Sequence, residues 1–144
     1  IATLVRGSRL WVAASDGEAI HVAVIDPAGD DVEAGPIAAL RSTAHGVQPG
    51  LAAIPEADLV ALCAPVGPGP WGGADVLDTV TVQLLDRDAR PLGPRVDVIH
   101  ADAVHGVDCA RNGRELLVAY TAEVDGEPTL AARRMRFETG LTID

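Results

Sequence analysis

The phrase Val104–Val107, which reads Val-His-Gly-Val, repeats the phrase Ala44–Val47, which reads Ala-His-Gly-Val, at a distance of 60 residues. Asp26 and Asp86 are separated by the same distance. Two independent markers at one spacing make a chance match improbable and indicate an internal repeat. A repeat of this kind is typical of chains that stack similar supersecondary units, because one such unit cannot bury its apolar face alone.

Each repeat contains short apolar runs of the kind that form strands. A first run is followed by a second, which in the first two repeats is β-branched and apolar at alternate positions, a pattern typical of half-buried strands. Pro, Gly and Asp form turns between the runs. The predicted strands are Leu10–Ala13, Leu59–Leu62 and Leu116–Ala119, then Ile20–Ile25, Val80–Leu85 and Leu130–Phe137, with shorter ones at Ile37–Leu40 and Val96–Ile99. No stretch combines a helix cap with a 3.6-residue period, so we predict an all-β chain.

The repeats divide one β domain into units of approximately 1–46, 47–106 and 107–144, of which the last is incomplete. The middle unit is longer because it contains an insertion, 65–78, rich in Pro and Gly. These residues favour turns and loops, so we expect a loop throughout the insertion.

Each unit resembles one blade of a β-propeller, and in particular the degenerate blade-like repeats of bacterial secreted and surface proteins. The resemblance implies about three four-stranded antiparallel sheets. Propellers typically close with 4–8 blades, so about three blades leave two open ends. We therefore expect the chain to associate with itself or another protein, or to be part of a larger propeller. The alternative fold is a single β-sandwich or barrel, which 144 residues also fit.

Composition limits the classes of partner. The net charge of -10 argues against binding to nucleic acid or to an anionic membrane surface. No apolar run approaches the ~18 residues that a transmembrane helix needs. All basic residues are Arg, and GC-rich codons dominate, which indicates a bacterial source. The chain begins at Ile1, so we expect a removed leader or a longer polypeptide, and we predict an extracellular or periplasmic location.

The two cysteines, Cys63 and Cys109, lie 46 positions apart and do not form a Cys-x-x-Cys pattern. They form one disulfide if the chain is exported, or they are two small buried apolar residues if it is not. The sequence leaves both alternatives open.

His45 and His105 occupy equivalent repeat positions. With His21 or His100 they are candidates for a transition-metal site, because imidazole suits zinc or copper. The structural alternative is that each imidazole bonds to the backbone of a neighbouring blade. Calcium is a further candidate cofactor, because the predicted turns carry several carboxylates, although these also cap turns.

Four residues are candidates for partner binding. Trp71 and Asp75 lie in the insertion, where no core requires a tryptophan, and a loop tryptophan stacks on sugars or anchors protein contacts. Arg134 and Arg136 belong to the main basic cluster, and strand alternation places both on the face opposite Met135. They are expected to pair with carboxylates of a neighbouring chain. Trp11, by contrast, aligns with Leu59 or Leu117 and is expected in the core.

No nucleophile elbow, cysteine nucleophile or paired carboxylates stand out, so the sequence indicates no catalytic site. We predict a non-enzymatic binding or assembly module of propeller type that presents loops to a partner. One alternative is lectin-like carbohydrate binding, which predicts one aromatic residue per blade at equivalent sites, a set that the sequence lacks. Another is a structural subunit, or a processed fragment, of a larger enzyme or complex.

Overall fold

The computed structural model describes residues 1–28, 31–42, 48–67, 76–137 and 141–143. Within these residues the chain forms twelve strands and one 3-10 turn, η1 (Pro55–Ala57), and no helix is long and apolar enough to cross a membrane. The strands are β1 (Ala2–Arg6), β2 (Arg9–Ser15), β3 (Ala19–Asp26), β4 (Asp31–Arg41), β5 (Gly50–Ile54), β6 (Leu59–Val66), β7 (Thr79–Leu85), β8 (Pro91–His100), β9 (Ala103–Asn112), β10 (Glu115–Val124), β11 (Glu127–Phe137) and β12 (Leu141–Ile143).

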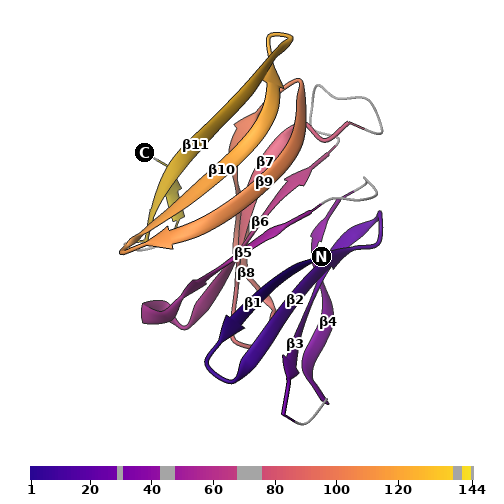
Figure 1. The fold of residues 1–144 in the computed structure, drawn as a ribbon, viewed down its shortest axis with the longest axis vertical. Coiled ribbons are helices and arrows are strands. Elements are labelled where there is room, and N and C mark those ends of the chain that lie inside the picture. The colour runs from indigo at the N-terminus through magenta and orange to yellow at the C-terminus, as the bar shows by residue number, and fades with distance from the viewer. Residues whose placement is uncertain (29–30, 43–47, 68–75, 138–140, 144) are drawn as a thin grey trace.

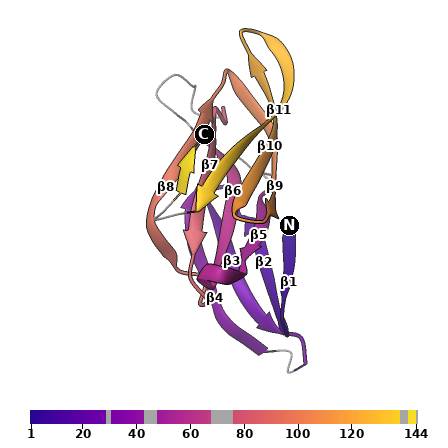
Figure 2. The ribbon, with the colours of Figure 1, turned by 90° about the vertical axis from the view of Figure 1, so that its left-hand side faces the viewer.

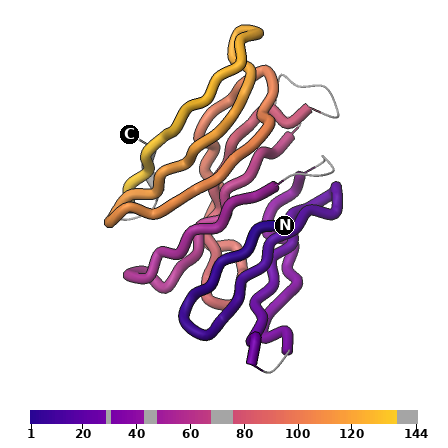
Figure 3. The backbone as a smooth tube through the Cα atoms, viewed as in Figure 1, coloured from indigo at the N-terminus to yellow at the C-terminus, as the bar shows by residue number. Residues whose placement is uncertain are grey.

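The strands form three four-stranded antiparallel sheets, each a meander of consecutive strands (Figure 3). The first sheet is β1–β4, the second β5–β8 and the third β9–β12. The second sheet lies between the other two, and the first and third lie at opposite ends of the molecule (Figure 1, Figure 2). The predicted fold class, all-β with three propeller-like blades, is confirmed, and the single sandwich or barrel is not formed.

The first strand of every sheet lies on the same side of the molecule. β5 contacts both β1 and β9, and the three strands run in the same direction (Figure 1). They are therefore the innermost strands of a propeller-like arrangement, while β4, β8 and β12 are outermost. The third sheet begins at Ala103, so the phrase Val104–Val107 lies within its innermost strand and not before it.

Two apolar layers hold the sheets together, one on each side of the second sheet. The layer between the first and second sheets is centred on Trp11, Ile20 and Leu62, which confirms Trp11 as a core residue. Its alignment with Leu117 agrees with the hairpin register, because each lies two residues after a strand start that pairs across the hairpin, Arg9 with Arg6 and Glu115 with Asn112. Trp11 is buried because its face of the first sheet packs on the second sheet, whereas the equivalent face of the third sheet points outward and leaves Leu117 40% exposed.

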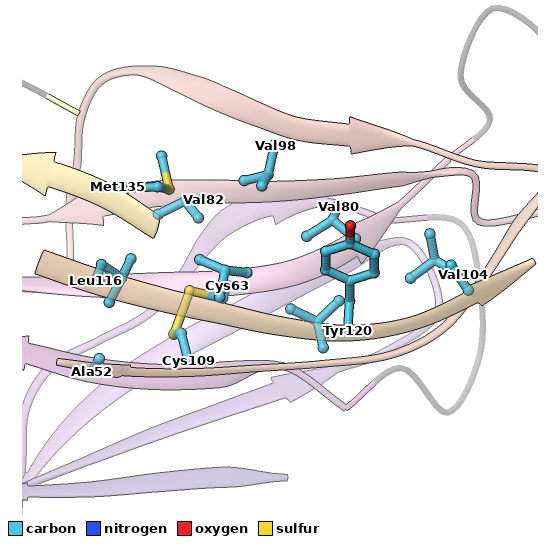
Figure 4. Close-up of a cluster of buried hydrophobic side chains, with 14 of the residues drawn as sticks. Ala52, Cys63, Val80, Val82, Val98, Val104, Cys109, Leu116, Tyr120 and Met135 are labelled. Atoms are coloured by element: carbon cyan, nitrogen blue, oxygen red, sulfur yellow. A yellow bond between two sulfur atoms is a disulfide. The ribbon is translucent and has the colours of Figure 1, made fainter. Parts of the chain in front are cut away.

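The layer between the second and third sheets contains Leu116, Met135 and the disulfide between Cys63 of β6 and Cys109 of β9 (Figure 4). The Cα atoms of the two cysteines are 6.2 Å apart, within the ordinary range for a disulfide. The structure thus decides between the two alternatives for these cysteines, and the bond joins two neighbouring sheets covalently.

The insertion in the middle unit is shorter than the sequence predicts. Pro65 and Val66 continue β6 and pair with Val80 and Thr79 of β7, so the connection between the strands runs only from residue 67 to 78. Pro65 lies beyond Cys63, the last residue of β6 that pairs with β5, so β6 has an edge at this point, where a proline is compatible with a strand. The prediction of a loop throughout 65–78 was wrong for residues 65 and 66, because it relied on the proline content of the segment and not on the apolar residues before it.

Candidate functional site

A cleft of about 600 Å³ lies where the innermost strands of the three sheets meet. We call it the inner cleft. The cleft is lined by the beginnings of β1 and β5 and by a central stretch of β9, so residues of all three sheets take part. The described lining residues are Ile1, Ala2, Thr3, Gln48, Pro49, Gly50, Leu51, His105, Gly106, Val107, Asp108, Ala119, Tyr120, Thr121 and Leu130.

The absence of a side chain at Gly50 allows β5 and β9 to approach each other at the cleft. A Cβ atom at this position would lie 2.8 Å from Asp108 Oδ1 and 2.9 Å from the backbone nitrogen of Cys109. Both distances are shorter than ordinary contacts, and the obstacle includes backbone. The Asp108 carboxylate is held by the same segment, because the Cys109 N–H donates to its Oδ1 at 2.8 Å. Gly50 therefore fixes the distance between two walls of the cleft.

The inner cleft is lined by mostly uncharged polar side chains together with one carboxylate. Thr3, Gln48, Asp108 and Thr121 are exposed there, so they offer hydroxyl, amide and carboxylate groups to a ligand. His105 is also exposed, and its Nε2 lies 3.3 Å from Glu123 Oε1. Among the described lining residues Asp108 is the one carboxylate and His105 the one imidazole. This set can form several hydrogen bonds with a neutral polar ligand.

The candidate metal residues are not brought together among the described residues. His45 lies outside them, and His105 is the cleft residue that pairs with Glu123. His21 Nε2 is 2.7 Å from Asp16 Oδ2, and His100 Nδ1 is 2.9 Å from the Thr79 hydroxyl. In the described part of the chain no group of three His, Cys, Asp or Glu side chains is placed to hold a metal ion.

The carboxylates proposed for calcium cap their own turns. Asp26 Oδ1 accepts the N–H of Ala28 at 2.9 Å, and Asp86 Oδ1 accepts the N–H groups of Asp88 and Arg90, also at 2.9 Å. These bonds satisfy backbone donors that the turns would otherwise leave open. The carboxylates of Asp26 and Asp86 therefore have a structural role in these two turns.

Asp16 has a clearly lowered pKa that follows from its local hydrogen bonds. The backbone N–H groups of Ala19 and Glu18 donate to its carboxylate, and His21 lies beside it. These interactions, the Ala19 bond first, lower the pKa of Asp16 from 3.8 to about 2. The group closes the hairpin between β2 and β3, so it belongs to the framework of the first sheet and not to the inner cleft.

Of the four residues predicted to bind a partner, Trp71 and Asp75 lie outside the described residues. Arg134 and Arg136 are exposed on β11, and Met135 between them is fully buried, as strand alternation predicts. Arg136 Nε lies 3.5 Å from Glu115 Oε1 of the neighbouring strand. Both arginines lie on the face of the third sheet that points away from the second sheet.

The cleft residues Thr3, Gln48, Asp108 and Thr121 were not singled out from the sequence. They lie up to 118 positions apart and share no motif. One signal pointed to the region: the repeated phrase that ends in Val107 lies in the wall of the cleft. Its meaning was hidden because the strand order of the sheets was needed to show that these segments face one another.

Three solved structures have the same fold over nearly the whole chain. An α-L-arabinofuranosidase from Clostridium thermocellum matches with a TM-score of 0.60 at 14% identity, covering 99% of this chain and 49% of that protein. An exo-1,5-α-L-arabinanase from a bovine ruminal metagenomic library matches with 0.63 at 14% identity, covering 99% and 55%. Kuenenia stuttgartiensis hydrazine synthase matches with 0.62 at 13% identity, covering 95% and 38%.

These likenesses support a propeller-like fold for the chain. The chain spans about half of the length of the arabinofuranosidase and of the arabinanase, and 38% of the hydrazine synthase chain. No protein-family model and no curated protein matches the sequence.

Proposed function

We propose that this chain is a non-enzymatic binding module of propeller type and that the inner cleft is its binding site. The observation that carries the proposal is the convergence of three sheets on one cleft. Residues as distant as Thr3, Gln48 and Asp108 line it together. Ligand sites favour such concave places, where several rigid elements each supply a few polar groups.

A neutral carbohydrate is the ligand class that the lining favours. Hydroxyl, amide and carboxylate groups bond well to sugar hydroxyls, while the net charge of -10 disfavours phosphorylated ligands. Two of the structures with this fold are named for action on α-L-arabinosides, which supports the same class. The described lining residues include no exposed aromatic platform, so we expect weak binding that depends on hydrogen bonds.

The proposal assigns no catalysis to the cleft. Glycoside hydrolysis typically uses two carboxyl groups that flank the scissile bond. The described lining residues supply one carboxylate, that of Asp108, whereas this mechanism needs two. For hydrolysis the second carboxyl group would have to come from a further sheet or from another chain.

Calorimetry with α-1,5-linked arabino-oligosaccharides tests the proposal. We expect a dissociation constant on the order of 1 mM, equivalent to about -4 kcal/mol. Asp108→Asn should weaken binding at least about fivefold, because hydrogen bonds to charged groups are worth about 1.5–3 kcal/mol. Asp97→Asn on exposed β8, away from the cleft, is the matched control. Binding that Asp108→Asn and Asp97→Asn affect equally, or no binding, would reject the cleft as a carbohydrate site.

The second candidate function is assembly, with the chain as a structural part of a larger propeller or complex. It is favoured by the share of each neighbour that the chain covers, about half for two of them. In this role Trp71 and Asp75 of the insertion, together with Arg134 and Arg136, contact a partner. The disulfide between Cys63 and Cys109 favours an extracellular or periplasmic location, where such bonds persist.

A further inference from the structure

The face of the first sheet that points away from the second sheet carries an apolar surface. We call it the outer face of the first sheet. One row crosses all four strands in register, with Val5 opposite Leu10, Leu10 opposite Ile25, and Ile25 opposite Val32. The next row pairs Val12 with Ala23, and the row after it pairs His21 with Ala14 and Ala38, so the apolar surface ends at the His21 imidazole, which lies beside Asp16. These residues belong to neither of the two core layers, and Val5 and Val32 are 72% and 55% exposed.

The strands of the first sheet have the sequence of strands that are covered on both faces. β6 and β7 of the second sheet are almost continuously buried, and their sequences are nearly unbroken apolar runs. β2 and β3 read in the same way, with apolar residues at consecutive positions. β10 instead alternates, with Glu115, Thr121 and Glu123 on its outward side. The first sheet therefore has the composition of a middle sheet although one of its faces is uncovered here.

We propose that the outer face of the first sheet packs on the outer face of the third sheet of a second copy of this chain. Within one chain, the first sheet packs on the second, and the second packs on the third with its opposite face. Repeating this relation head to tail brings the third sheet of one copy against the first sheet of the next. The centre of the third sheet's outer face carries the small or apolar residues Ala110, Leu117, Ala119 and Ala132, and Arg134 and Asp108 lie in the same two rows.

Charge complementarity favours this occupant. Arg41 and its β3 partner Ala19 lie on the outer face of the first sheet, next to the inward-facing pair Leu40 and Ile20. Glu123 lies on the outer face of the third sheet, next to the buried Ala122. Because the innermost strands run in the same direction, Glu123 and Arg41 lie at corresponding ends of their sheets (Figure 1). Head-to-tail packing therefore brings these opposite charges together.

The contact also completes the inner cleft. Ala119, Thr121 and Leu130 line the cleft and belong to the outer face of the third sheet, where Leu130 is 81% exposed. The first sheet of the second copy would cover these residues and form the missing wall. The role of this wall in ligand binding rests on the proposed function, whereas the contact between copies does not.

The mass of the folded protein in solution tests the contact. Native mass spectrometry and light scattering at about 100 μM should show a closed assembly of 14.9 kDa chains, with the dimer as the smallest form. Val32→Arg, at a position already exposed, should raise the dissociation constant at least about tenfold by burying an unpaired charge. Leu92→Arg, on an exposed apolar residue of the second sheet, is the matched control and should leave the mass unchanged.

A charge exchange identifies the occupant. Glu123→Arg and Arg41→Glu should each weaken the assembly, and the double variant should restore it at least in part. An assembly that Val32→Arg abolishes but Glu123→Arg does not affect would overturn head-to-tail packing. A wild-type monomer at 100 μM would overturn the proposal entirely. Calorimetry on the same samples separates this failure from that of the proposed function, because a monomer that still binds sugar contradicts only the contact between copies.

Discussion

The first and third sheets occupy equivalent positions at the two ends of the molecule, yet their outward faces differ. The outward face of the first sheet carries an unbroken apolar row from Val5 to Val32. The corresponding row of the third sheet begins with Asn112, Glu115 and Arg136. A sheet face that carries charges is compatible with water, whereas a continuous apolar face costs free energy until it is covered. The difference shows that the two ends of this stack are not equivalent.

The two end sheets also differ in how they are attached to the second sheet. Each end sheet has an apolar layer and an ion pair to the second sheet, Arg6 with Asp58 for the first and Arg111 with Glu56 for the third. The third sheet has an apolar layer and, in addition, the disulfide between Cys63 and Cys109. The third sheet, whose outward face carries charged residues, is thus the end sheet that is covalently bound to the second sheet.

Removal of the disulfide should have the largest effect on this comparison. The bond spans 46 positions of sequence, and loop-closure entropy predicts a loss of about 4 kcal/mol in the free energy of unfolding when it is removed. Urea denaturation of the Cys63→Ala/Cys109→Ala variant measures the loss. Protection of amide hydrogens should fall more in β9–β11 than in β1–β3. Equal loss in both end sheets would show that the disulfide does not distinguish them.

Adjacent leucines of β10 separate the two faces of the third sheet. Leu116→Ala should cost about 2–5 kcal/mol in the free energy of unfolding, because it opens a cavity in a fully buried layer. Leu117→Ala, on the 40% exposed outward side, should cost less than about 1 kcal/mol in the monomer. Both are measured by urea denaturation at low protein concentration. Similar costs would contradict the assignment of inner and outer faces.

Gly35 tests the close packing of β4 on β3 in the first sheet. Its φ is +86°, and an added Cβ would lie 2.5 Å from the carbonyl oxygen of Val22. Gly35→Ala should therefore destabilise the protein by about 2–3 kcal/mol. Gly7→Ala is the control, since Gly7 has a φ of +61° but open space around it, and we expect a loss of about 1 kcal/mol. Thermal unfolding of both variants measures the difference, and a smaller loss at Gly35 would contradict the packing of this strand.

The smallest expected effect is pH-dependent and lies in the hairpin of the first sheet. The pKa of Asp16 is about 2 in the folded protein against 3.8 normally, so its stabilising contribution is present above pH 4. The contribution is lost as pH falls from about 4 to 2. Asp16→Asn should lower the midpoint of thermal unfolding slightly at pH 6, and the difference from wild type should vanish near pH 2. Asp125→Asn, in the corresponding hairpin of the third sheet, controls for removal of one acidic charge.

Much of the fold could be predicted from the sequence because the signals are local. Leu59–Leu62 and Val80–Leu85 form strands since apolar and β-branched residues fit a buried sheet, and Asp86 turns the chain since its carboxylate caps backbone donors. Alternation placed Arg134 and Met135 on opposite faces. The alignment of Trp11 with Leu117 was also right, but the sequence did not show that the second sheet covers Trp11 while Leu117 lies on an outward face.

The sequence by itself determined eight of the twelve strands, most turns and the number and order of the sheets, because each depends on residues close together in the chain. The first strand of each sheet, β1, β5 or β9, was not among the strands predicted by residue range, and neither was β12. Only the tertiary structure decided that Cys63 bonds to Cys109, that Gly50 lets β5 approach β9, and that Thr3 and Asp108 line one cleft. These features depend on how whole sheets pack against one another. Such packing follows from the summed burial of many side chains, and no local pattern records it.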